Sequence, residues 1–162
     1  MDKKTVLWLG AGCVVVCVML GIALLVLGGA FVNWAMEEPE NITVDMTLPV
    51  EVAKGDEFVM EVQVTNSANE PQELNSIDID VSYLDGVIIN RTEPIYSDFS
   101  EIEFVKSFHS YFFGNDIPAN SSFIVKFYMT ALKPGDFSGS VDVCINSEVE
   151  CLEYFARTII HE

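Results

Sequence analysis

The sequence predicts an all-β protein, an antiparallel two-sheet sandwich of about 7–8 strands, preceded by one transmembrane α-helix. Three observations predict this. Residues 6–32 contain no Asp, Glu, Lys, Arg, His, Asn or Gln. From residue 41 onward apolar side chains alternate with polar ones, the period of a half-buried strand. Turn signals recur throughout that part, and no amphipathic helical pattern appears after residue 36. The predicted organisation is a cytoplasmic head at 1–5, the span at 6–32, a linker at 33–40 and an extracytoplasmic domain at 41–162.

The apolar run is long enough to cross a bilayer. It has roughly 27 residues, against about 20 needed to cross the hydrocarbon layer. Trp8 and Trp34 flank it and are predicted interface anchors, because indole is apolar but its N–H favours water. Lys3 and Lys4 precede the run, whereas only acids follow it closely. The positive-inside rule therefore predicts a single-pass protein of the cell membrane with its N-terminus in the cytoplasm.

Two further features of the run bear on its role. Gly28, Gly29 and Ala30 are small enough for a signal peptidase, but the run is about twice as long as a signal peptide's apolar region, which favours an uncleaved signal-anchor. Small residues also share one helical stripe, where they let two helix backbones approach closely. The stripe predicts a seam with a second copy or another membrane subunit, against the simpler interpretation that such residues are common in membrane helices. Its members are Gly10, Cys13, Cys17, Gly21 and Gly28.

The outer domain begins with an alternating strand at 42–48. Pro49 interrupts it and the pattern resumes at 50–52, which suits a first strand that switches sheets. A turn at 54–56 leads to a strand. Its predicted inward side chains are Phe58, Met60, Val62 and Val64. Ile77 to Tyr83 alternate next, and Asp85-Gly86 predicts a hairpin.

The rest of the domain continues the same pattern. Residues 92–102 read as a loop. Strands are predicted from 87 and at 104–113, 123–131, 137–145 and 149–160. The last two put Cys144 directly opposite Cys151 across a tight turn, within reach of a disulfide. Two free thiols in a cytosolic domain are the alternative, and the predicted orientation favours the bond.

Two stretches resemble a known family. Residues 50–79 read VEVAKGDEFVMEVQVTNSANEPQELNSIDI, and residues 117–145 read IPANSSFIVKFYMTALKPGDFSGSVDVCI. The Gly-Asp turn, the strand ending in Thr-Asn and the late turn before an aromatic strand resemble the immunoglobulin-like, CARDB-type domains of prokaryotic cell-surface proteins. The resemblance implies an immunoglobulin-like sandwich at the cell surface, with adhesion or protein contact as its role. It carries over no catalytic residue.

The charge is concentrated in the outer part. Of 25 acidic and 8 basic side chains, all but Asp2, Lys3 and Lys4 lie at or beyond Glu37. The segment 37–162 therefore has 24 acids and 6 bases, a net charge of about −18. Such a surface repels phosphates, so the sequence excludes nucleic acid as a partner. There is no His/Cys cluster with metal-ligand spacing and no nucleotide or nucleophile motif, so we expect neither an enzyme nor a cofactor.

Three weaker candidate sites remain. Asp78, Asp80 and Asp85 are the best calcium ligands the sequence offers, although a solvated sheet face is the favoured explanation for them. Tyr111, Phe112 and Phe113 would form a sugar platform if exposed, but aromatics in a sandwich are more often core. Glycosylation sequons begin at three asparagines, Asn41, Asn90 and Asn120.

The sequence thus predicts a membrane-anchored extracytoplasmic domain that acts by protein binding, in adhesion or in cell-envelope assembly. Its partners would be the lipid around the span and another envelope or membrane protein. The alternative is an accessory or structural subunit of a membrane complex, recognised through its transmembrane helix, with homo-oligomers formed through the same helix. A carbohydrate- or calcium-binding module is a further alternative.

Overall fold

The computed structural model describes residues 41–103 and 107–162, which belong to one compact unit, Glu38–Glu162. The predicted membrane span lies outside the described residues, together with Trp8, Trp34 and the small-residue stripe. Within the described part of the chain, no helix is long and apolar enough to cross a membrane. The membrane anchor therefore stays a prediction from the sequence.

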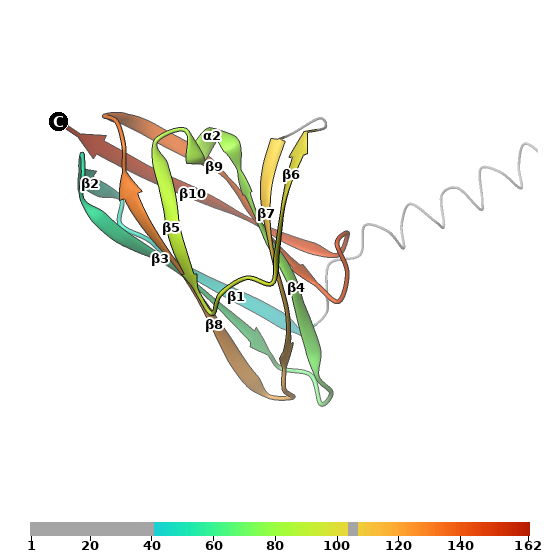
Figure 1. Cartoon of the computed structure of the whole chain (residues 1–162). Helices are drawn as coiled ribbons and strands as arrows, with labels where there is room; N and C mark the ends of the chain where they lie inside the picture. The colour runs from blue at the N-terminus through green and yellow to red at the C-terminus, as the bar shows by residue number, and fades with distance from the viewer. Residues whose placement is uncertain (1–40, 104–106) are drawn as a thin grey trace, which may run out of the picture. The chain divides into compact units, whose positions relative to one another are not determined.

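The described residues form a two-sheet β-sandwich of ten strands and one helical turn (Figure 1). The elements are β1 (Ile42–Thr47), β2 (Glu51–Ala53), β3 (Glu57–Asn66), β4 (Gln72–Asp80), α2 (Val81–Leu84), β5 (Val87–Glu93), β6 (Asp98–Glu103), β7 (Ser107–Ile117), β8 (Ser121–Ala131), β9 (Gly135–Ile145) and β10 (Cys151–His161).

One sheet has four strands in the order β1-β3-β8-β5, and the other has six in the order β2-β10-β9-β4-β7-β6. The predicted all-β sandwich is confirmed. The predicted number of strands, 7–8, was too low, since the described residues form ten. The prediction of purely antiparallel pairing was wrong, because β2 runs parallel to β10. All other strand pairs in the described residues are antiparallel.

The sheet switch expected at Pro49 is confirmed. β1 pairs with β3 in the four-stranded sheet, and β2 pairs with β10 in the six-stranded one. The crossing is held by the Thr158 hydroxyl, which donates to the Pro49 carbonyl at 3.1 Å, and by the Ile159 N–H, which donates to Val50 at 2.8 Å. β2 keeps the direction of β1 after the chain has crossed to the other sheet. It therefore runs parallel to β10.

The strand predicted up to Tyr83 ends at Asp80. The Asp80 carboxylate accepts the Ser82 N–H at 2.7 Å and starts the helical turn α2. This local hydrogen bond replaces the strand pairing that would otherwise extend β4. Tyr83 is buried nonetheless, and its hydroxyl lies 3.1 Å from that of Thr158. The hairpin predicted at Asp85-Gly86 was wrong, because β4 and β5 belong to different sheets.

The segment 92–102, predicted as a loop, contains β6. The chain leaves β5 through a cis peptide bond at Glu93-Pro94 and then pairs with β7 from Asp98 to Glu103. This pairing follows from the neighbouring strand rather than from local alternation, which the segment lacks. The prediction missed β6 for this reason.

The core lies between the sheets and matches the predicted inward side chains. Met60, Val62 and Val64 of β3 face Phe127 and Val125 of β8, and all five are fully buried. The register of the last hairpin is also confirmed: Cys144 faces Cys151, and a disulfide joins them. The second sheet contributes five further large buried side chains, Leu74, Ile77, Ile79, Ile117 and Ile145.

Candidate binding cleft

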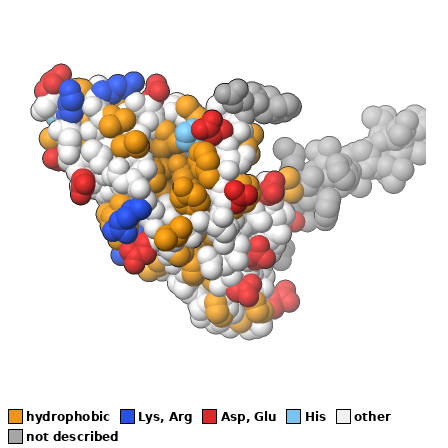
Figure 2. Space-filling model, viewed as in Figure 1, with side chains coloured by type: hydrophobic (Ala, Val, Ile, Leu, Met, Phe, Trp, Pro, Cys, Tyr) orange, Lys and Arg blue, Asp and Glu red, His pale blue; other side chains and the backbone are white. Residues whose placement is uncertain are grey.

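A small cleft, here called the edge cleft, lies between the outer strands of the two sheets. β5 is the last strand of the four-stranded sheet, and β6 is the last strand of the six-stranded sheet. The cleft has a volume of about 170 Å³. Figure 2 shows hydrophobic side chains gathered on this face, with acidic groups and a histidine at the border. The lining residues are Ile89, Asn90, Arg91, Tyr96, Phe99 and Tyr111.

A chain of aromatic rings connects this cleft to the core. The ring of Tyr111 packs edge-on against Phe127 at 5.4 Å on the core side, and against Tyr96, also at 5.4 Å, on the cleft side. Phe99 lies 5.2 Å from Tyr111 and 5.4 Å from the ring of His109. Such tilted and edge-on pairs are the favoured aromatic geometries. The rings at the surface are therefore held in place from below.

Tyr111 connects the core to the edge cleft, because its ring contacts both Phe127 and Tyr96. Its side chain is only 6% exposed, and burial, helped by Tyr96 and Glu101, raises the pKa of Tyr111 to about 12. The hydroxyl consequently keeps its proton further into base than an exposed tyrosine does. At the base of the cleft it is a hydrogen-bond donor rather than a charge.

A bulge in β5 shapes the other wall. The register with β8 shifts between Ile89 and Arg91, and a bulge of this kind redirects the extra side chain. The Asn90 amide donates to the Thr130 hydroxyl at 2.8 Å. The Arg91 guanidinium lies 3.3 Å above the ring of Tyr128 and is also paired with Glu93. Both side chains are thereby fixed at the rim.

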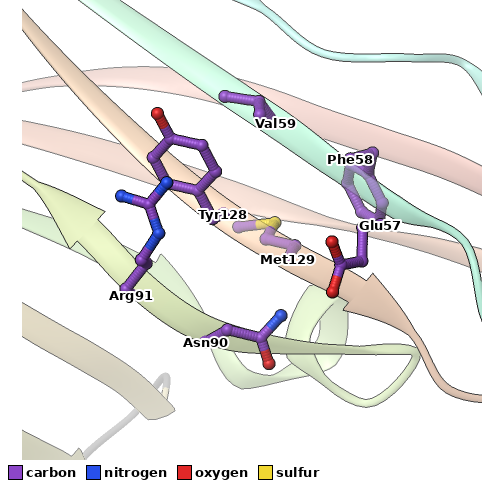
Figure 3. A pocket seen from close by; sticks show the side chains of 7 residues that line it. All are labelled: Glu57, Phe58, Val59, Asn90, Arg91, Tyr128 and Met129. Atoms are coloured by element: carbon purple, nitrogen blue, oxygen red, sulfur yellow. The ribbon is translucent and has the colours of Figure 1, made fainter.

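A second hollow, of about 310 Å³, opens on the other side of β5. Figure 3 shows the Arg91 guanidinium lying against Tyr128 at one end and the Glu57 carboxylate at the other. Asn90 and Arg91 line both hollows. The β5 bulge is thus a wall with a recess on each side. The second hollow is lined by Glu57, Phe58, Val59, Asn90, Arg91, Tyr128 and Met129.

The sugar platform suggested by the sequence is contradicted. Tyr111 and Phe113 are buried and point between the sheets, packing on Phe127. Phe112 lies between them in β7 and therefore points to the opposite face. Three consecutive strand residues cannot share a face, so they form no common stacking surface.

The three aspartates considered for calcium have separate roles. Asp80 caps α2, Asp85 ends it, and Asp78 lies on the outward face of β4 beside Ser76 and Ser110. Burial raises the pKa of Asp78, and the neighbouring hydroxyls of Ser76 and Ser110 oppose that shift. Among residues 41–103 and 107–162, no three His, Cys, Asp or Glu side chains are grouped closely enough to hold a metal ion.

The three sequons lie in different settings. Asn41 and Asn120 are exposed and adopt positive φ values of 63° and 54°, in the left-handed region that asparagine tolerates. Asn90 lies at the rim of the edge cleft. The Thr92 hydroxyl of that same sequon is buried and accepts the Tyr96 N–H at 3.2 Å.

Tyr96 and Phe99 are the cleft residues that the sequence analysis missed. Both lie in the segment interpreted as a loop. One signal was available: two aromatic residues in a mostly polar or acidic stretch, where neither alternation nor helical periodicity gives them a core position. Large aromatics without a predicted place in the core deserve consideration as surface groups.

No family model and no curated protein matches this chain. Among solved structures it is similar to the cupredoxin domain of amoB from Nitrosocaldus yellowstonii, at 10% identity and a TM-score of 0.50, over 77% of this chain and 90% of that one. It also resembles a cohesin module from the family 33 glycoside hydrolase of Clostridium perfringens ATCC13124, at 15% identity and a TM-score of 0.44, over 75% and 97%. At such identities the likeness shows a β-sandwich fold alone, and no family is assigned.

Proposed function

We propose that this chain is a single-pass, membrane-anchored protein whose acidic β-sandwich lies outside the cytoplasm and binds another envelope protein, in adhesion or assembly, rather than catalysing a reaction. The edge cleft is the observation that carries this proposal. It presents aromatic side chains at the surface of a strongly acidic domain.

The exposure of these side chains supports a binding role. Ile95 is 83% exposed, and Tyr96 and Phe99 are 37% and 38% exposed. Protein interfaces are enriched in aromatic side chains and in arginine. Arg91 stands at the rim of the same cleft, already ordered by Tyr128. The patch therefore has the composition of an interface centre with a polar border.

Two observations support the location. The apolar run at 6–32 is long enough to anchor the chain, and the lysines before it favour a cytoplasmic N-terminus. The Cys144–Cys151 disulfide is of a kind that persists in oxidising compartments. Both point to a domain outside the cytoplasm. The resemblance to immunoglobulin-like surface domains agrees with this placement.

The test is capture of partners by the full-length protein from native membranes. Tyr96→Ser and Phe99→Ser should lose the captured protein, because they remove buried contact area at the centre of the interface. Phe155→Ser is the matched control: Phe155 is also an exposed aromatic, at 67%, but lies on β10. Equal capture by all three variants would overturn the proposal that the edge cleft is the binding surface.

The alternative role, an accessory subunit recognised through its span, is favoured by the small-residue stripe in the sequence. Substitution of Gly10, Cys17 or Gly21 by leucine would then abolish capture, because a larger side chain separates the two helix backbones. Loss of the partner in these variants, with normal capture by Phe99→Ser, would favour that alternative over cleft binding.

A further inference from the structure

We infer that the free edge of β6 accepts one more β-strand, supplied by a partner segment in which basic and apolar side chains alternate. This rests on the proposed function, since it specifies which protein segment the edge-cleft face would bind and how. Four observations lead to it: the free edge, its regular backbone without proline or bulge, apolar side chains on both of its faces, and its charge.

β6 is hydrogen-bonded on one side only. Its six residues pair in regular antiparallel register with β7, from Asp98 opposite Phe112 to Glu103 opposite Ser107. In the described structure no strand pairs with its other side. An edge strand of this kind presents a row of backbone N–H and C=O groups that can template a further strand.

The other three sheet edges carry features that limit pairing. β2 has only three residues. β5 contains a bulge and runs into the cis Glu93-Pro94 bond, and a proline has no N–H to donate. β1 exposes polar side chains at Thr43, Asp45 and Thr47. β6 contains no proline, no lysine and no shift in register, so the backbone of this edge is free to pair and only its three acids oppose an added strand.

Both faces of β6 also leave apolar area uncovered. Phe99 is 38% exposed and points to the edge cleft, where it packs on Tyr111. Ile102 is 40% exposed and lies beside Phe108, which puts it on the opposite face of the sheet. A strand added beside β6 would cover both side chains at once, with its own alternate side chains on the two faces. A partner bound only in the cleft would leave Ile102 exposed.

The charge of β6 selects the occupant. Asp98, Glu101 and Glu103 are its only ionisable residues. If a second copy paired through its own β6 with Glu101 opposite Glu101, the two like charges would be directly opposed, which is destabilising, and the paired edges would gather six acids in one short ladder. A basic strand would meet the same acids favourably. The sequence of β6 thus disfavours self-association and fits a lysine- or arginine-containing segment.

The test uses the full-length chain in nanodiscs of zwitterionic lipid and a labelled eight-residue peptide of alternating lysine and valine. The peptide should bind and should slow amide hydrogen exchange in residues 98–103, because new strand hydrogen bonds protect those groups. Two peptides serve as controls. One has glutamate in place of lysine, and the other keeps every lysine but replaces two valines with proline.

Ile102→Lys should weaken binding of the lysine–valine peptide by about tenfold or more, since a lysine on the edge repels the peptide and removes apolar area. Thr43→Lys adds the same charge to the other exposed edge, β1, and should change binding much less. The exchange measurement on the unmodified chain supports or overturns the inference even if a variant fails to fold.

The outcomes separate this inference from the proposed function. Equal binding of the lysine–valine and proline-containing peptides, or no added protection in 98–103, would mean that only charge attraction operates, and would overturn strand addition. The proposed function stands in that case if Phe99→Ser still loses the captured envelope protein. If capture is indifferent to Tyr96 and Phe99, the proposed function fails whatever the peptide does.

Discussion

At the scale of single residues, Tyr111 shows how burial sets chemistry. It occupies an inward position of β7 and joins the core ring of Phe127 to the surface rings of Tyr96 and Phe99. Desolvation disfavours the phenolate, so its pKa is raised from about 10 to about 12. The floor of the edge cleft therefore carries an uncharged tyrosine, while the surface around the cleft is acidic.

This pKa predicts how stability changes in base. Between pH 10 and about 12 the unfolded chain loses the Tyr111 proton while the folded chain retains it. The free energy of unfolding should therefore fall as pH rises through that window, and Tyr111 contributes no pH dependence below it. Denaturant titrations from pH 9 to pH 12 measure the slope.

Tyr111→Phe is the matched control for that slope. It keeps the ring packing and removes the ionisable hydroxyl, so the slope should become shallower. It should not vanish, because burial also raises the pKa of Tyr83. Identical slopes for the two proteins would contradict the assignment of a raised pKa to Tyr111.

At the scale of elements, the β9–β10 hairpin combines ladder and covalent bond. Ten residue pairs extend from Cys144–Cys151 to Gly135–Ile160. At its far end the Arg157 guanidinium makes two hydrogen bonds to the Asp136 carboxylate, of 2.9 and 2.7 Å, which lower the pKa of Asp136. The disulfide secures the end beside the turn. Both termini of the hairpin are thus fixed by side chains.

Removal of the disulfide should cost stability without changing the fold. The double variant Cys144→Ser, Cys151→Ser should lose about 2–3 kcal/mol of unfolding free energy, because the unfolded chain regains the freedom of a short closed loop. Denaturant unfolding with and without reductant measures this, and the double variant serves as the control that reductant should not affect.

The same bond tests the proposed location. Protein isolated from its host in the presence of an alkylating reagent should show no modification of Cys144 or Cys151. Alkylation of both residues would place the domain in a reducing compartment and would contradict the extracytoplasmic placement.

At the scale of the whole molecule, charge imbalance is the dominant electrostatic feature. The ion pairs between described residues take up the few cations: Arg91 with Glu93, Lys126 with Glu61, Lys133 with Asp85, and Arg157 with Asp136. All of these pairs are on the surface, where such pairs contribute little. Most acids therefore repel one another across the domain.

Screening this repulsion should stabilise the protein. Raising NaCl from about 20 mM to about 500 mM shortens the Debye length from about 20 Å to a few ångström, which weakens long-range repulsion more than it weakens the short ion pairs. The melting temperature of the full-length chain should rise, as followed by thermal unfolding at constant pH. A fall would mean that the surface ion pairs outweigh the net charge. Sodium sulfate at matched ionic strength separates screening from general salt effects.

The sequence by itself determined those elements in which the apolar side chains alternate and so show which face is buried. The alternation in β3 and β8, the sheet switch at Pro49 and the opposition of Cys144 and Cys151 could all be predicted, because a strand's period of two shows which side chains face inward. The candidate site could not. Its residues Tyr96 and Phe99 belong to a strand with no alternating pattern of its own.

Only the tertiary structure decided the edge cleft. β6 exists because β7 offers a partner, the turn α2 replaces the end of a predicted strand because Asp80 caps it, and Asn90 and Arg91 take their places through a bulge. Pairing at an edge, capping and bulging depend on what lies beside the chain in space rather than on its own periodicity. The fold class is thus a local property of this sequence, whereas the edge cleft arises where two sheets end side by side.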